Sequence, residues 1–127
     1  MKKSALVLSA LLVLGSCELI PFAAAAAVGI WSYDEYSDEG GNIVVETTPG
    51  RAWEAAKAVA RARGEEVEIA EAPMRISCRI DESEVLIRVV MFERTQELAE
   101  IKVSARQLVR GRADIARDVA ESIADRL

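Results

Sequence analysis

The sequence predicts an α+β fold, a single two-layer domain over residues 43–127. Its sheet should be mostly antiparallel, with four to five strands, and two helices should cover one face. Three segments in the second half of the chain alternate apolar and polar residues, as half-buried strands do. Segments with apolar residues at steps of three and four lie on both sides of this block and predict the two helices. Short connections between the later strands favour an antiparallel meander.

A short strand and a helix open the domain. Residues 43–47 are rich in β-branched side chains, which favour strands. Thr48 followed by Pro49 is typical of a helix N-cap with proline at the first helical position. This helix should run to about Arg63, because Gly64 is a common C-terminal stop. Its apolar face consists of Trp53, Ala56, Val59 and Ala60.

The block between the two helices should form the remaining strands. Residues 66–70 form a short strand with many glutamates, which indicates a solvated sheet edge that discourages strand addition. Strands over 74–80 and 84–92 follow, and the last strand ends near Ala105. The side chains expected to face the core are Met74, Ile76, Cys78, Ile80, Val85, Ile87, Val89, Met91, Ala99, Ile101, Val103 and Ala105.

A second helix should close the chain. It starts at about Arg112, and its stripe of apolar residues recurs at helical spacing. The stripe comprises Ile115, Val119, Ile123 and Leu127, widened by Ala116 and Ala120. This helix and the first one would cover the same face of the sheet.

The chemistry of the chain argues against an enzyme. There is no histidine, which removes the commonest general base and a common metal ligand. Cys78 is in phase with the core positions of its strand, so it should be a structural thiol and not a nucleophile. No two acids are placed inside the core by the pattern, as a paired-carboxylate hydrolase would need. We expect no cofactor and no metal site.

The sheet face that the helices leave uncovered is the candidate partner surface. Its residues mix cations with apolar side chains, which often marks a contact surface. The residues that alternate onto it are Arg75, Arg79, Leu86, Arg88, Val90, Phe92, Leu98 and Lys102. The possible partner surface within it consists of Arg75, Arg79, Arg88, Val90 and Phe92. The partner would be a protein, although a basic stripe could also meet anionic lipid or glycan. The alternative is ordinary cross-strand pairing with Glu84 and Glu100, with residues 19–31 as a cover.

The N-terminus has the three parts of a secretory signal over residues 1–16. Lys2 and Lys3 are followed by an apolar run over 5–14, which as a helix rises only ~15 Å and is too short to span a bilayer. Small residues and then Cys17 end the segment. An uncleaved membrane helix over residues 5–30 is the alternative, but it would bury a glutamate and contain a proline.

Leu14-Gly15-Ser16-Cys17 resembles the lipobox of bacterial lipoproteins. The resemblance implies that the thiol of Cys17 takes a diacylglycerol and that the signal is cut before it. Several acyl chains would hold the protein on a membrane almost permanently. Because Glu18, and not aspartate, follows the cysteine, the resemblance favours the outer membrane, with the protein facing the periplasm.

The whole chain resembles a family of small bacterial lipoproteins with a C-terminal domain of unknown function. The matching pieces are "LGSC", "AAAAAVGIWSY", "TTPGRAWEAAKAVARARG", "AEIKVSA" and the closing helix. The family implies an envelope location and no assigned activity.

Residues 17–42 should connect the anchor to the domain. The apolar part, 19–31, either lies in the lipid interface with Trp31 and Tyr33 at the headgroups, or packs on the domain as a helix. Residues 32–42 contain four acids and a glycine pair and predict a solvated linker.

Three functions are compatible with this sequence. The first is a membrane-anchored envelope lipoprotein that acts as a non-enzymatic binding or accessory module. The second is a carrier of a small ligand or lipid, which needs an apolar cavity of ~300 Å³ or more. The third is the paired-carboxylate hydrolase. A formal net charge of −5 disfavours nucleic acid as a partner.

Overall fold

The computed structural model describes residues 29–34 and 37–127 of the chain. The predicted signal peptide, the predicted lipidation site Cys17 and the apolar segment up to residue 28 lie outside the described residues. The elements are β1 (Trp31–Tyr33), β2 (Gly40–Val45), α2 (Pro49–Arg63), β3 (Glu65–Glu71), β4 (Met74–Ile80), β5 (Ser83–Phe92), β6 (Thr95–Gln107), β7 (Arg110–Gly111) and α3 (Ala113–Ala124). Neither of these helices is long and apolar enough to cross a bilayer.

The α+β class and the antiparallel sheet are confirmed, but the sheet is larger than predicted. In the described residues it has seven strands in the order β1-β2-β6-β5-β4-β3, and β7 pairs with β6. Every neighbouring pair is antiparallel. The prediction of four to five strands was wrong because β1 and β7 have only three and two residues, too few to show an alternating pattern.

The sheet also begins earlier in the chain than the sequence indicates. β1 and the first half of β2 lie within residues 32–42 or next to them, where a solvated linker was expected. The hairpin fits because Gly41 has no side chain: a Cβ there would lie 2.0 Å from the carbonyl oxygen of Ser32. Trp31 at the start of β1 is only 9% exposed and belongs to the core. Burial of one aromatic ring therefore holds a polar segment in the sheet.

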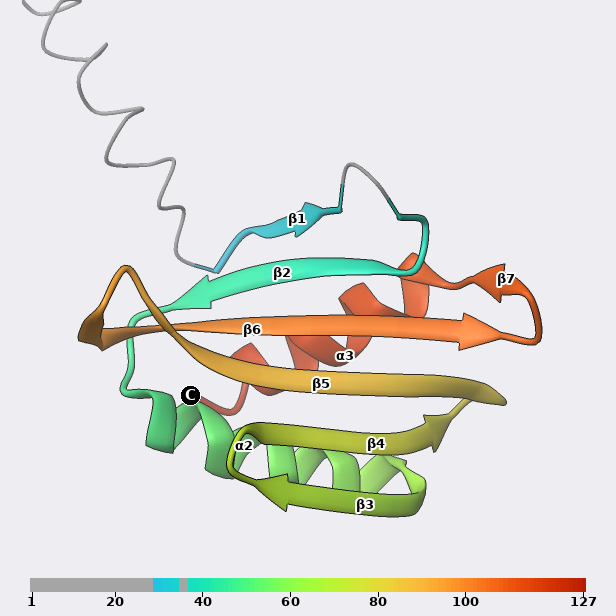
Figure 1. Ribbon diagram of the computed structural model, residues 1–127, viewed down its shortest axis with the longest axis horizontal. Coiled ribbons are helices and arrows are strands. Elements are labelled where there is room, and N and C mark those ends of the chain that lie inside the picture. Colours follow the sequence, from blue (N-terminus) through green and yellow to red (C-terminus); the bar gives the residue numbers. More distant parts are fainter. Residues whose placement is uncertain (1–28, 35–36) are drawn as a thin grey trace, which may run out of the picture.

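Both helices lie on one face of the sheet, as predicted, and Figure 1 shows them behind the strands. The core fills the space between the two layers and forms one cluster. Ile76, Ile87 and Ile101 from three adjacent strands are fully buried, as are Val119 and Ile123 of α3. Neither α2 nor α3, the helices of residues 29–34 and 37–127, lies on the outer side of the sheet, so the two faces have different chemistry.

The helix boundaries follow the predicted caps. The Thr48 hydroxyl oxygen accepts a hydrogen bond from the backbone N–H of Arg51 at 3.2 Å, and Gly64 ends the helix with its N–H bonded to the Ala60 carbonyl. Trp53 is buried, and its indole Nε1 donates to a carboxylate oxygen of Glu71 in β3 at 2.7 Å. That bond connects α2 to β3, which is the edge strand on one side of the sheet.

Two predicted core positions are exposed. Leu127 is 49% exposed because α3 ends at Ala124, before the stripe reaches it. Met91 is 46% exposed although it is in phase with buried residues of β5, since it lies where the strand meets its hairpin.

The acidic edge predicted for the first of the later strands is confirmed. β3 is the last strand of the sheet on one side, and Glu66 and Glu68 on it are exposed. Glu66 has a φ of 52°, and the pairing register shifts there between Glu65 and Glu68. Charge and a bulge together discourage another strand from pairing with this edge.

We expect Ile101→Ala to lower the free energy of unfolding by ~2–5 kcal/mol, because Ile101 is 0% exposed on a central strand. Val90→Ala on the outer side should cost less than ~1 kcal/mol, since Val90 is 37% exposed. Urea unfolding followed by tryptophan fluorescence measures both values. Equal costs for the two variants would contradict the assignment of the faces.

Candidate functional site

The sheet side without helices, here called the outer face, is the candidate site. The five predicted surface residues come from β4 and β5. They alternate with buried neighbours: Ile76 and Cys78 in β4, and Ile87 and Val89 in β5. Arg75, Arg79, Arg88 and Val90 therefore lie on the outer face, and Phe92 follows at the end of β5, just after a shift of register. The register places Arg79 opposite Glu84 near the start of β5, so Arg79 and Phe92 lie at opposite ends of this face.

Three cations form a line across the middle of the outer face, here called the cationic row. Arg75 pairs with Arg88 in the strand register, and Arg88 pairs with Lys102 on β6. Side chains directly opposite on antiparallel strands have Cβ atoms only ~4.5–5.5 Å apart, so like charges there repel. Within residues 29–34 and 37–127, the side chains of Arg75 and Arg88 have no ion pair or hydrogen bond. Most of the positive charge in this row is therefore not neutralised.

The expected pairing with acids is only partly present. Lys102 Nζ lies 3.7 Å from a carboxylate oxygen of Glu100, and Asn42 Nδ2 donates to the other oxygen of the same carboxylate. The Glu100 side chain is 16% exposed, so it neutralises Lys102 from a half-buried position. Glu84 lies opposite both Arg79 and Arg106 in the register. That row alternates charges, whereas the cationic row does not.

Apolar side chains lie beyond the cationic row, at what we call the apolar end of the outer face. Val90 is opposite Glu100, which is opposite Val44. Phe92 and Leu98 follow on the same strands and are half-buried. Val44 is 8% exposed, yet it is not part of the core between the layers. The apolar end comprises Ile30, Val44, Val90, Phe92 and Leu98.

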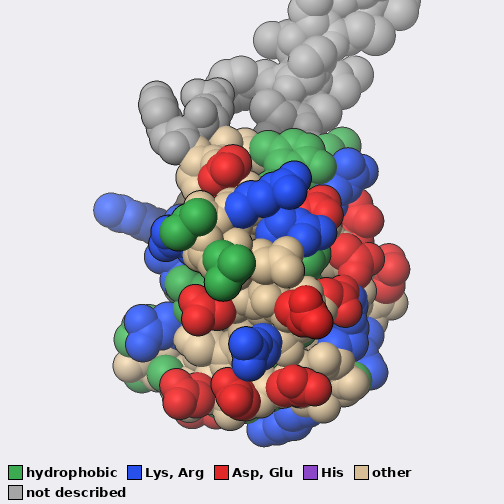
Figure 2. Space-filling model, turned by 90° about the vertical axis from the view of Figure 1, so that its right-hand side faces the viewer, with side chains coloured by type: hydrophobic (Ala, Val, Ile, Leu, Met, Phe, Trp, Pro, Cys, Tyr) green, Lys and Arg blue, Asp and Glu red, His purple; other side chains and the backbone are tan. Residues whose placement is uncertain are grey.

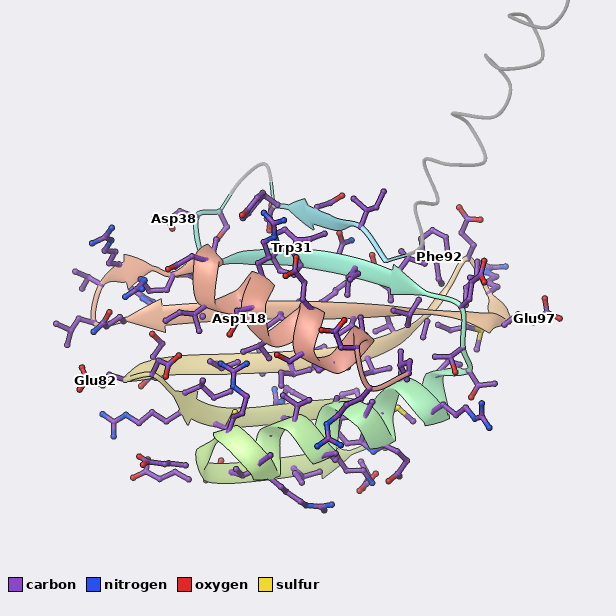
Figure 3. The ribbon with its side chains drawn as sticks, turned by 180° about the vertical axis from the view of Figure 1, so that it is seen from behind. Trp31, Asp38, Glu82, Phe92, Glu97 and Asp118 are labelled. Atoms are coloured by element: carbon purple, nitrogen blue, oxygen red, sulfur yellow. The ribbon has the colours of Figure 1, made fainter. Side chains whose placement is uncertain are left out.

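The described chain enters the sheet at this same end. The N–H of Gly29 donates to the carbonyl of Val44 at 2.6 Å, and Ile30 beside it is 63% exposed. Figure 3 places the labelled Phe92 beside the start of β1, and Figure 1 shows the β5–β6 hairpin on that side. The apolar end and the N-terminal entry are therefore neighbours.

A hollow of about 450 Å³ opens between the cationic row and the other end of the outer face. Arg88, Lys102, Ser104 and Gly40 are among the residues that line it. Charges of both signs and scattered apolar side chains share the end of the molecule near β7, which faces the viewer in Figure 2. The outer face thus changes from apolar to cationic to mixed charge along the strands.

The structure gives Trp31 a place that differs from the expected headgroup position. Its ring is buried on the helix side of the sheet and meets Tyr33 edge-on, with centroids 5.8 Å apart. The Tyr33 hydroxyl accepts from Arg117 Nη1 of α3 at 3.4 Å. Both aromatics therefore contact neighbouring parts of the domain, and Trp31 is a core residue.

The titratable groups with shifted pKa values do not form a catalytic constellation. Burial raises the pKa of the Cys78 thiol, which keeps it neutral in the core. A hydrogen bond from Arg112 is the main cause that lowers the pKa of Asp114 to about 2, whereas a general acid needs a raised pKa. The part of the chain that the structure describes holds no group of three or more possible metal ligands.

Sequence reasoning missed two parts of this surface. Asn42 was assigned to the linker, although continuing the alternation back from Ile43 would have placed it on the outer face. Ile30 belongs to the site only because β1 pairs with β2, which no pattern in three residues reveals.

No family model, curated protein or solved structure matches this chain. The resemblance to small bacterial lipoproteins therefore remains an expectation, and the function must be argued from the outer face and the N-terminal sequence.

We expect Arg88→Gln to raise the free energy of unfolding by ~0.5 kcal/mol at low salt, because it removes the middle charge of the cationic row. The gain should largely vanish at 1 M salt, where the Debye length is only ~3 Å. Urea unfolding at the two salt concentrations measures it.

Arg61→Gln is the control, since Arg61 is an exposed cation in the last turn of α2, where positive charge is favourable. It should give no gain. A loss of stability in Arg88→Gln at low salt would show that Arg88 has a partner that outweighs the repulsion.

Proposed function

We propose that this protein is a lipid-anchored bacterial envelope lipoprotein whose domain is a non-enzymatic binding module. The anchor would be Cys17, and the protein would sit on the outer membrane and face the periplasm. The contact surface would be the outer face, with Arg75, Arg79, Arg88, Val90 and Phe92 distributed along it. The observation that carries the proposal is the cationic row beside the apolar end.

This arrangement has a stability cost that packing does not explain. Arg75 and Arg88 face each other directly and gain no acid partner among the described residues. Neutral polar residues at these positions would remove the repulsion and keep the strands. A binding surface explains the pattern, because a partner with negative charge and apolar surface would contact both the cationic row and the apolar end.

The two alternatives have less support from this structure. A carrier would hold its ligand between sheet and helices, where the side chains instead pack into one contiguous core. A paired-carboxylate hydrolase needs two acids close together, one with a raised pKa. Asp114, the carboxyl group with the clearest shift, has a pKa lowered to about 2.

Acyl labelling tests the anchor. Cells that express the full chain and are fed a labelled fatty acid should yield a labelled mature protein, and Cys17→Ala should yield none. The Cys78→Ala variant is the matched control and should label like the unchanged protein, because Cys78 is buried in the core. Label that persists in Cys17→Ala, or a product that still begins at Met1, would contradict a lipidated N-terminus.

Cysteine accessibility tests the contact surface whatever the partner is. In a Cys78→Ala background, Val90→Cys should react with a water-soluble maleimide at least ~5-fold more slowly in intact envelopes than in detergent, since contact excludes water. Ala58→Cys is the control: it lies on α2, away from the outer face, at a half-buried position, and it should react equally in both.

Adding Arg79→Glu and Arg88→Glu to Val90→Cys should restore fast labelling in envelopes, because the charge reversal removes the attraction. Circular dichroism shows whether these variants keep the fold. Equal labelling rates at position 90 in envelopes and detergent, before any charge reversal, would show that the outer face contacts nothing.

A further inference from the structure

The apolar end and the cationic row are consecutive layers of one surface. Val90 and Arg88 are two residues apart on β5, and Glu100 and Lys102 are two apart on β6. Residues at that spacing lie ~7 Å apart along a strand and point to the same side. Apolar side chains therefore come first from the chain entry, and guanidinium and ammonium groups come next.

That order matches the depth profile of a phospholipid monolayer at its water boundary. Apolar side chains enter the region of the upper acyl chains, and Lys and Arg one layer back reach the phosphates. Each cation near an anionic surface contributes roughly a 5-fold gain in binding, which corresponds to ~1 kcal/mol. Ile30 and Val90 supply exposed aliphatic surface, and Arg75 and Arg88 supply charge without a competing acid partner.

The position of the chain entry favours a membrane over a protein as the binding partner of the outer face. Gly29, next to the apolar end, is separated from Cys17 by a segment that even when fully extended reaches only ~40 Å. A lipid on Cys17 would keep the apolar end near the bilayer at an effective concentration of ~1 mM. Under that condition a weak surface interaction is enough to orient the domain.

We propose that the outer face docks on an anionic phospholipid bilayer, with the apolar end inserted in the interface and the cationic row on the lipid phosphates. This rests on the proposed lipid anchor. Glu46 and Glu93 are also exposed at this end, so the inserted side chains must supply part of the binding. A protein partner on the same surface is the competing outcome of the test.

The experiment uses the full-length, acylated protein in a Cys78→Ala background, with an environment-sensitive fluorophore on Val90→Cys. The fluorophore should shift to shorter wavelength when the protein is reconstituted in phosphatidylglycerol vesicles. The shift should be smaller in phosphatidylcholine vesicles and in 0.5 M salt. The same fluorophore on Ala58→Cys, outside the outer face, should not shift.

Charge reversal separates docking from tethering. With Arg75→Glu and Arg88→Glu added, the fluorophore at position 90 should return to its aqueous emission, and the affinity of the face for phosphatidylglycerol should fall at least ~25-fold. Arg51→Glu and Arg61→Glu on α2, both at exposed positions away from the outer face, form the matched control and should leave the shift unchanged.

Three results would overturn the docking proposal. They are an unshifted fluorophore at position 90 while the protein still floats with the vesicles, an equal shift at position 58, and a shift that needs native membranes and not pure lipid. The last result identifies a protein partner. Failure of the lipid anchor is a distinct result: the protein would not float, and the unmodified thiol of Cys17 would carry a second fluorophore.

Discussion

Burial of one face of the sheet against two helices is the constraint on which the rest of the structure depends. Ile43, Ile76, Ile87 and Ile101 extend across four neighbouring strands and are at most 1% exposed. In a domain of this size, that single core must supply most of the stability. Both apolar helix stripes are used on the inner face, so neither helix of the described residues covers the outer one.

The parts of the fold that repeat a pattern could be predicted, and the parts that depend on a single contact could not. Alternation over six or more residues placed β4, β5 and β6, and Thr48 and Gly64 placed the ends of α2. β1 was missed because its pairing depends on the ring of Trp31 and on the missing side chain of Gly41. Short strands have no period to read, so local composition, here acidic, dominates the prediction.

The candidate site shows the same division. Alternation alone put eight residues on one face, since every second residue of a strand points the same way. It could not show that Arg75, Arg88 and Lys102 are direct neighbours, because that requires the register between strands. It also could not show that the chain entry at Gly29 lies beside Val44. The backbone hydrogen bond between them joins residues 15 positions apart in sequence, and alternation within a strand does not reveal such a contact.

A weak contact can matter in this molecule because of how it would be held. Free in solution, a few exposed aliphatic side chains and three cations on an acidic protein would bind a membrane poorly. A lipid at Cys17 would provide the attachment, so the outer face would only need to choose an orientation. In that orientation the two helices and the mixed-charge end of the sheet would face the periplasm. The like-charged strand pairs then have a physical rationale: their repulsion is relieved when lipid phosphates lie across the row.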